Sequence, residues 1–192
     1  MNKRNRLLLC LAAIAIAVIG LLAPASADAR TVHHGSRATS VVASTSSTAG
    51  LLLRHRSSII YVEDHTGWRW PVTNAVYDWD YGTDASVRYG ACRAGYGCIK
   101  VYEGNYGRNG QLGVAYFSWI GSILQEPVTV KLNDSYYPDY HVRRQTVCHE
   151  LGHGLGIEFH DPVLTSCLYG AGTDAAPYGP GAWGRYWLNA DY

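Results

Sequence analysis

Short apolar runs rich in Ile, Val and aromatic residues recur along the chain after residue 58, and turn-forming residues separate them. Segments such as EGNYGRNG and NDS combine Gly, Asn, Asp and Ser, which favour turns over regular structure. Apolar runs of this length between turns are typical of β-strands. The pattern predicts five strands, at residues 58–66, 86–89, 99–103, 112–119 and 128–132.

Two longer segments have the period of amphipathic helices. Residues 71–80 open on Pro71, which suits the first position of a helix. Their expected buried face consists of Val72, Ala75, Val76 and Trp79. A second helix begins near Tyr140, and its apolar stripe consists of Val147, Leu151 and Leu155. His149 lies about 200° around this helix from Leu151, so we expect it to face a cleft while the stripe packs on the core.

Residues 1–29 have the organisation of a secretory signal peptide. A basic head precedes an almost wholly apolar stretch at residues 7–22, and APASADA supplies small residues for cleavage near Ala27 or Ala29. The alternative is a membrane anchor, but a span takes about 20 apolar residues and this stretch is shorter. The sequence therefore predicts a secreted, extracellular protein with no membrane association after signal removal.

The remainder divides by composition into two parts. Residues 30–58 are rich in Ser, Thr and Ala and contain no aromatic residue, which predicts a flexible pro-segment or linker in which His33, His34 and His55 have no role. All 6 Trp and all 15 Tyr follow, so residues 59–192 form the expected packed domain. The net charge of +1 provides no basic stripe for nucleic acid, and we expect a monomer.

Four cysteines remain after signal removal, an even number that suits disulfides in an oxidising compartment. Of the three pairings that four cysteines allow, we favour Cys92 with Cys98 and Cys148 with Cys167. A zinc knuckle is the alternative for the first pair, but the C-x5-C spacing is longer than such sites use.

The segment CHELGHGLGIEFHD, residues 148–161, contains an H-E-x-x-H motif on the second predicted helix. His149 and His153 lie one helical turn apart on the same side, where their imidazoles can share one tetrahedral zinc ion. Glu150 is angled toward a water on that zinc. Gly156 can adopt the positive φ that turns the chain back and brings His160 to the same metal. Histidines that only form hydrogen bonds are the alternative.

With these residues the chain resembles the metzincin metallopeptidases, and among them the matrixin-like secreted proteases. His149, Glu150, His153 and Gly156 match H-E-x-x-H-x-x-G, the first part of the family signature. The resemblance implies an α+β, zincin-like domain with a twisted, mostly parallel five-stranded sheet, about three helices and the zinc helix at the floor of the cleft. GVAYFSW and VTVKLNDS are similar to that family's edge strand and the strand after it.

The sequence departs from the family at two positions near the metal. The family's third histidine falls on Phe159, and His160 follows one position later. We favour His160 as the third ligand because imidazole is the commonest one, and Asp161 is the alternative. The family's methionine-bearing turn has no methionine here, so Leu168 takes that place; Leu and Met have similar volumes.

The sequence contains other residues that could bind a metal. GTDAAPYG resembles the aspzincin motif and makes Asp174 a fallback third ligand. The gluzincin class is nearly excluded, because Glu158, the only downstream glutamate, lies too close to His153. Val114 and Lys131 stand where some matrixins place further histidines, so we predict no second zinc. Calcium stays open: the spacing of Asp78, Asp80 and Asp84 lacks the pattern of a dedicated loop and favours a solvated helix end.

The resemblance implies a zinc-dependent endopeptidase in which Glu150 is the general base for a zinc-activated water. A protein or peptide substrate would lie extended along Gly113, Val114, Ala115 and Tyr116 and pair with their backbone. The competing interpretation is a secreted zinc-binding domain without catalysis. Such a closed site would have four protein ligands, the fourth being Asp161 or Asp174.

Overall fold

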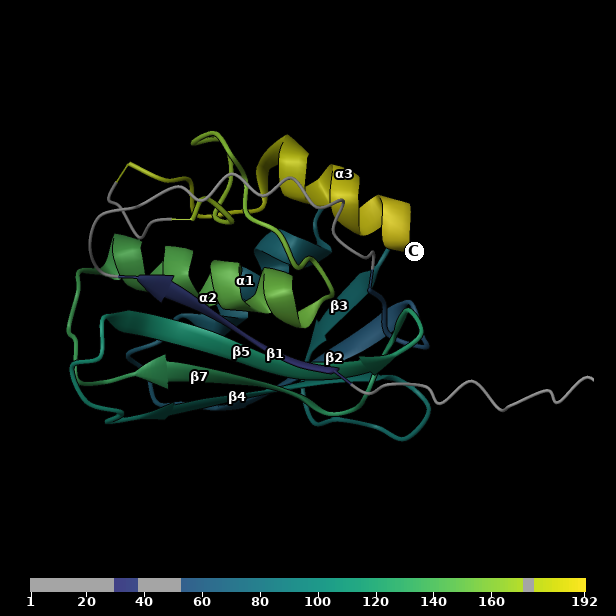
Figure 1. The fold of residues 1–192 in the computed structure, drawn as a ribbon, viewed down its shortest axis with the longest axis horizontal. Coiled ribbons are helices and arrows are strands. Elements are labelled where there is room, and N and C mark those ends of the chain that lie inside the picture. Colours follow the sequence, from purple (N-terminus) through teal and green to yellow (C-terminus); the bar gives the residue numbers. More distant parts are fainter. Residues whose placement is uncertain (1–29, 38–52, 171–174) are drawn as a thin grey trace, which may run out of the picture.

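A mixed β-sheet carries the three helices of the described chain on one side (Figure 1). This computed structural model describes residues 30–37 as backbone, and residues 53–170 and 175–192 in full. The strands are β1 (Arg30–Arg37), β2 (Ile59–His65), β3 (Ser86–Tyr89), β4 (Gly97–Gly104), β5 (Gln111–Ile120), β6 (Ile123–Leu124) and β7 (Val128–Asn133). The helices are α1 (Val72–Asp80), α2 (Tyr140–Gly154) and α3 (Gly181–Asp191).

The order of the strands separates a parallel part of the sheet from an antiparallel part. The order is β1-β5-β7-β4-β2-β3, with the short β6 on β5. Strands β3, β2, β4 and β7 pair in parallel. Strand β5 runs antiparallel to β7 on one side and to β1 on the other. The chain is therefore an α+β protein, and β5 lies at the junction.

The helices form where the sequence predicted them, for identifiable reasons. The buried residues of α1 are Val72, Ala75, Val76 and Trp79, which confirms its apolar face. The Asp139 carboxylate accepts a hydrogen bond from the backbone N–H of Val142 and so caps the start of α2. The Trp79 indole N–H donates to the Cys148 carbonyl at 2.9 Å and joins the two helices at the centre of α2.

The five predicted strands are present within about two residues of their expected ends. The prediction of a mostly parallel, five-stranded sheet is wrong, because the sheet is mixed and has seven strands. The additional strands are β1, which lies in a segment with little apolar pattern, and the two-residue β6. The glycine-rich tail of the chain forms α3.

The boundary expected at residue 59 is too late. Leu53 is fully buried in the core and His55 is 1% exposed. Residues 30–37, expected to be flexible, form β1 in the sheet. Structure therefore begins well inside the predicted pro-segment or linker; the predicted signal peptide lies outside the described residues.

Two disulfides join Cys92 to Cys98 and Cys148 to Cys167, as the sequence analysis favoured. They indicate an oxidising or extracellular environment. The second joins the middle of α2 to the segment that follows it. Across the residues described, no helix has the length and apolar character needed to cross a membrane.

Candidate metal centre

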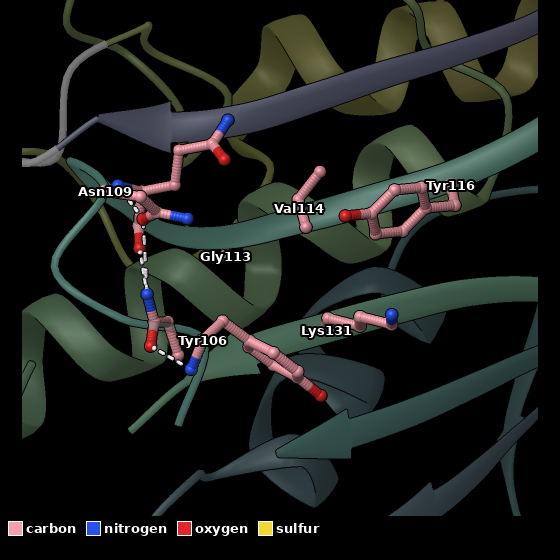
Figure 2. Close-up of a pocket in the computed structure, with 8 residues that line it drawn as sticks. Tyr106, Asn109, Gly113, Val114, Tyr116 and Lys131 are labelled. Carbon is pink, nitrogen blue, oxygen red and sulfur yellow. Dashed lines mark hydrogen bonds between the residues drawn. The ribbon is translucent and has the colours of Figure 1, made fainter. Parts of the chain in front are cut away.

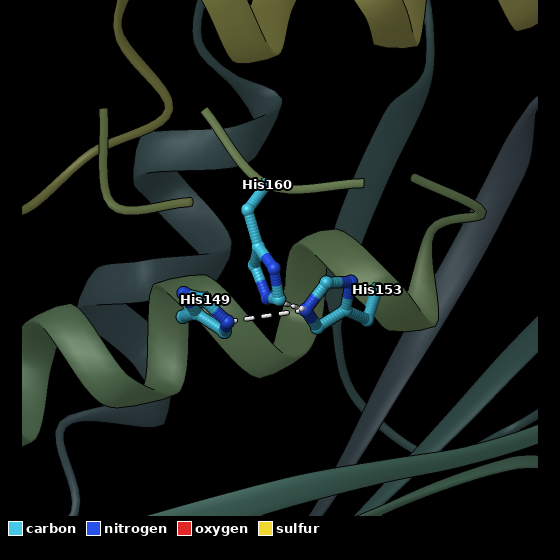
Figure 3. Close-up of side chains that lie close together, drawn as sticks. All are labelled: His149, His153 and His160. Carbon is cyan, nitrogen blue, oxygen red and sulfur yellow. Dashed lines mark hydrogen bonds between the residues drawn. The ribbon is translucent and has the colours of Figure 1, made fainter. Parts of the chain in front are cut away.

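Three histidine rings point toward one another beside the last turns of α2 (Figure 3). His149 and His153 lie on the helix, and His160 comes from the loop after it. The Nε2 atom of His153 lies 3.1 Å from Nε2 of His149 and 3.3 Å from Nε2 of His160. The potential ligand atoms all lie within 4.8 Å of one another, which fits the coordination of a single ion.

The opposite ring nitrogens show which way the lone pairs point. Nδ1 of His149 lies 2.9 Å from the Cys167 carbonyl oxygen, and Nδ1 of His153 lies 2.6 Å from that of Ile157. A carbonyl oxygen only accepts hydrogen bonds, so each Nδ1 carries the proton and donates it. In neutral rings the Nε2 lone pairs then face each other and repel unless a cation lies between them. The cluster can therefore bind a metal ion, with backbone carbonyls orienting two of its rings.

The turn after α2 brings His160 back to the helix. Gly156 has a φ of +116°, and a Cβ atom there would lie 1.9 Å from the Leu53 carbonyl oxygen. No other residue type fits both constraints, so the predicted role of Gly156 in reversing the chain is confirmed. Phe159, where the family places its third histidine, instead packs against Trp187 with ring centroids 4.6 Å apart. His160 is the exposed member of the cluster, and the neighbouring protein atoms still desolvate its ring enough to lower its pKa, which favours the neutral form.

The alternative ligands have other positions. Asp161 is buried, but its carboxylate accepts hydrogen bonds from the backbone N–H of Val163 at 3.0 Å and from the Thr165 hydroxyl at 2.6 Å. It therefore stabilises the turn that follows, and the three-histidine cluster does not include it. Asp174 lies outside the described residues.

Glu150 lies between α2 and β5. Its side chain is fully buried, and a Cβ atom added at Gly113 would lie 2.7 Å from Glu150 Cγ and 3.1 Å from its carboxyl carbon. Only glycine at position 113 leaves room for this carboxylate against the strand. The acid of the H-E-x-x-H motif is thus placed beside the β5 backbone, next in sequence to His149.

The face of α2 that carries the motif is covered, where the sequence predicted a cleft. His149, Glu150 and His153 are at most 1% exposed. The turn around Leu168 covers part of this face. The Cys167 carbonyl accepts the hydrogen bond from His149, and the fully buried Leu168 side chain packs against α2 at Gly152. Leu168, which the sequence analysis put in the place of the family's methionine, therefore packs against the helix that carries the motif.

The predicted substrate-binding residues lie on β5 and alternate between the two faces of the sheet. Gly113 faces α2, so Val114 and Tyr116 face away from it. There they line a shallow pocket (Figure 2), in which the Lys131 ammonium lies 5.1 Å from the Tyr116 ring centre and 5.4 Å from that of Tyr106. None of the three histidines lines this pocket.

The expectation that β5 is an edge strand is wrong for this structure. Gly113 to Tyr116 pair with β7 on one side and with Ser36 to His33 of β1 on the other. The backbone that was expected to bind a substrate is therefore already paired on both sides. The reason is the strand formed by residues 30–37, which the sequence pattern did not predict.

A second buried histidine, His55, was missed by the sequence analysis. Its Nδ1 contacts the Glu126 carboxylate, its Nε2 lies 2.9 Å from the Gly154 carbonyl at the end of α2, and its backbone N–H donates to the Tyr192 hydroxyl at 2.8 Å. The other Glu126 oxygen accepts from the backbone N–H of Cys98. The apolar LLL at residues 51–53 was the available signal that packed structure starts here.

The acidic residues considered for calcium hold elements together. Asp78 forms a two-pronged ion pair with Arg144 of α2, with bonds of 2.8 to 3.1 Å. Asp80 accepts a hydrogen bond from the backbone N–H of Val87 in β3. Asp80 is exposed at the end of α1, in keeping with the solvated helix end that the sequence favoured, whereas Asp78 is partly buried in its ion pair.

Comparison with known proteins adds no relative. No family model matches the chain, and no curated protein matches it significantly.

Proposed function

We propose that this protein is a secreted zinc-dependent endopeptidase of metzincin type. The observation that supports the proposal best is the convergence of three Nε2 atoms at 3.1 to 3.3 Å while two of the rings donate their Nδ1–H to backbone carbonyls. That arrangement orients neutral imidazoles toward one point, as metal ligation requires. The two disulfides support export to an oxidising compartment.

Zinc is the metal that this donor set favours. Zinc sites use imidazole nitrogen readily, and sites with three protein ligands keep a fourth position for water or substrate. Among the described residues the cluster contains three histidines and no fourth His, Cys, Asp or Glu. Three histidine ligands with Glu150 beside them are the set of side chains that a catalytic zinc site uses. Asp174, the third ligand in the aspzincin alternative, is outside the described residues.

The chemistry divides between the ion and the side chains. When bound at such a site, zinc acts as a Lewis acid and lowers the pKa of a coordinated water to about 7. Glu150 accepts the proton of the attacking water and passes it to the departing amine, first as general base and then as general acid. The contact of the buried Glu150 side chain with Gly113 supports this role, because Gly113 lies on β5, the strand that we expect to bind the peptide. The β5 backbone would hold that peptide in extended form.

The test compares the secreted protein with Glu150→Gln, using bound zinc per chain and casein cleavage as readouts. We expect about one zinc in both and a loss of cleavage of at least about 100-fold in the variant, the size of a general-base contribution. Glu158→Gln, a partly exposed glutamate eight positions further along, is the matched control and should retain both. Zinc binding by all three proteins without cleavage by any would instead support the non-catalytic domain.

A further inference from the structure

The strand β1 lies along the part of β5 that is nearest to the candidate site. Its register places Ser36 opposite Gly113 and Gly35 opposite Val114, and it continues antiparallel to Arg30 opposite Trp119. Gly113 is also the residue against which Glu150 packs. Strand β1 further contacts α2, and Figure 1 shows it running beside β5 on the side of that helix. It therefore occupies the space that a peptide pairing with β5 next to Glu150 would need.

The position of β1 in the sheet makes it removable. It is the first strand of the order β1-β5-β7-β4-β2-β3 and pairs with β5 alone. Its departure breaks one strand pairing and leaves the parallel core of β7, β4, β2 and β3 intact. It would also leave β5 with an unpaired row of N–H and C=O groups, which is a template for another extended chain.

The sequence of β1 makes its pairing weak and exchangeable. RTVHHGSR contains one strongly apolar residue, Val32, and a strand of this composition has a weakly specified register. Backbone hydrogen bonds are then the main attraction, and any extended peptide provides the same ones. Arg37 at its end is followed in the sequence by residues 38–52, a stretch rich in Ser, Thr and Ala.

We propose that residues 30–37 are an internal occupant of the peptide-binding edge of β5 and keep the protein inactive until they are displaced or cut away. This inference rests on the proposed peptidase function for its inhibitory effect, whereas the docking of β1 can be measured without it. A substrate and β1 would compete for the same backbone groups of Gly113 to Trp119. Activation would thus be a strand exchange, in which a substrate replaces β1 on the edge of β5 next to Glu150.

The test removes backbone donors from β1 in the full secreted chain. Successive N–H groups of a strand point to opposite sides, so one of the two neighbours Val32 and His33 donates toward β5. Replacing both by proline therefore removes a donor that faces β5, whichever of the two it is. Val32→Ala with His33→Ala changes the same side chains and keeps both donors, and is the matched control. The readouts are casein cleavage and hydrogen exchange of Phe117 and Trp119, which pair with β1. The Ser118 carbonyl accepts from the Gln125 N–H on the other side of β5, so the amides of its two neighbours point toward β1.

We expect the double-proline variant to lose exchange protection at Phe117 and Trp119. It should also gain at least about tenfold in kcat/KM, which is the gain when an occupant blocks about 90% of molecules. The double-alanine variant should match the parent. The synthetic peptide RTVHHGSR, added in trans, should restore protection to the double-proline variant and inhibit it, whereas the same peptide with proline at its third and fourth positions should not.

The outcomes separate the two proposals. Fast exchange at Phe117 and Trp119 in the unmodified parent would overturn the docking of β1, and this measurement needs no variant to fold. Lost protection in an active protein whose kcat/KM does not rise would overturn its inhibitory role. If no form cleaves casein but the peptide in trans restores protection, the proposed function fails while the occupancy of β5 by β1 stands.

Discussion

The buried histidines His149 and His153 of α2 differ from the buried His55, which contacts the end of that helix, in the partners of their ring nitrogens. His149 and His153 each direct one nitrogen to a carbonyl and the other to a neighbouring imidazole. His55, equally buried, directs one nitrogen to the Glu126 carboxylate and the other to the Gly154 carbonyl. Both partners of His55 are acceptors from the protein itself. Burial therefore does not distinguish a candidate metal ligand from a structural histidine, whereas the partners of both ring nitrogens do.

The largest effect is expected from His153→Ala, which removes the nitrogen common to the two short Nε2 contacts. Bound zinc should fall from about one ion per chain to a small fraction, with loss of casein cleavage. The stabilisation by zinc should disappear as well, since an ion at about 1,000 times its Kd adds about 4 kcal/mol to the folded state. Metal analysis and unfolding with and without zinc measure both effects.

His141→Ala is the matched control for this prediction. His141 lies in the first turn of the same helix, and its Nε2 lies 2.7 Å from the Ala176 carbonyl, away from the cluster. It should keep zinc binding and the zinc-dependent shift in stability. Full retention of zinc by His153→Ala would contradict the assignment of the cluster as the metal site.

The sequence predicted the elements that carry the candidate site because their signals are local. The apolar stripe of Val147, Leu151 and Leu155 fixes one side of α2, and each of these residues is fully buried. The four-residue spacing of His149 and His153 then determines that their rings are neighbours. The choice of His160 over Asp161 followed from the ligand preference of imidazole, and the structure brings His160 into the cluster.

The features that were missed depend on contacts between distant parts of the chain. Strand β1 has little apolar pattern of its own, and its strand conformation comes from pairing with β5 about 80 residues later. His55 stands in a polar segment, and its partner Glu126 is 71 positions away. The covering of the motif face by the turn at Leu168 likewise depends on tertiary packing. No periodicity within one segment contains this information.

Substitution of His55 tests the structural half of the comparison. His55→Ala leaves the Gly154 carbonyl and a Glu126 oxygen without their present partner in a buried setting, which should destabilise the protein by about 2–4 kcal/mol. The metal cluster loses no ligand, so zinc stoichiometry should stay near one ion per chain. Urea unfolding of the zinc-loaded proteins, with metal analysis of the folded fraction, measures the two quantities separately.

The chain provides a close control in His65. Its Nε2 lies 2.7 Å from the Glu63 carboxylate, so it forms a similar histidine–glutamate pair, but its side chain is 40% exposed. His65→Ala should cost about 0–1 kcal/mol, as exposed pairs do. Equal costs for the two substitutions would show that the His55 network has no special structural role. Loss of zinc from His55→Ala would show that the two histidine sets are coupled through the end of α2.

The smallest effect is expected from Asp191, which lies beside the His55 region through Tyr192 and Arg54. Burial raises the pKa of Asp191 to about 7, against the opposing effect of Arg54. Below about pH 4 the carboxyl is protonated in both folded and unfolded chains, and its burial costs little. As pH rises from about 4 to 7 the unfolded chain releases this proton first, so Asp191 makes the folded state progressively less stable.

Asp191→Asn should therefore stabilise the protein by about 1–3 kcal/mol at pH 8 and by less than about 0.5 kcal/mol at pH 4. Urea unfolding of the variant and the parent at pH 8 and pH 4 measures the difference in their free energies of unfolding. Metal release at acid pH affects both proteins equally and cancels in this difference. Asp84→Asn removes an exposed carboxyl and should show no such change with pH. An equal gain at both pH values would mean that Asp191 acts through packing, and the region around His55 would then contain no buried charge that opposes folding.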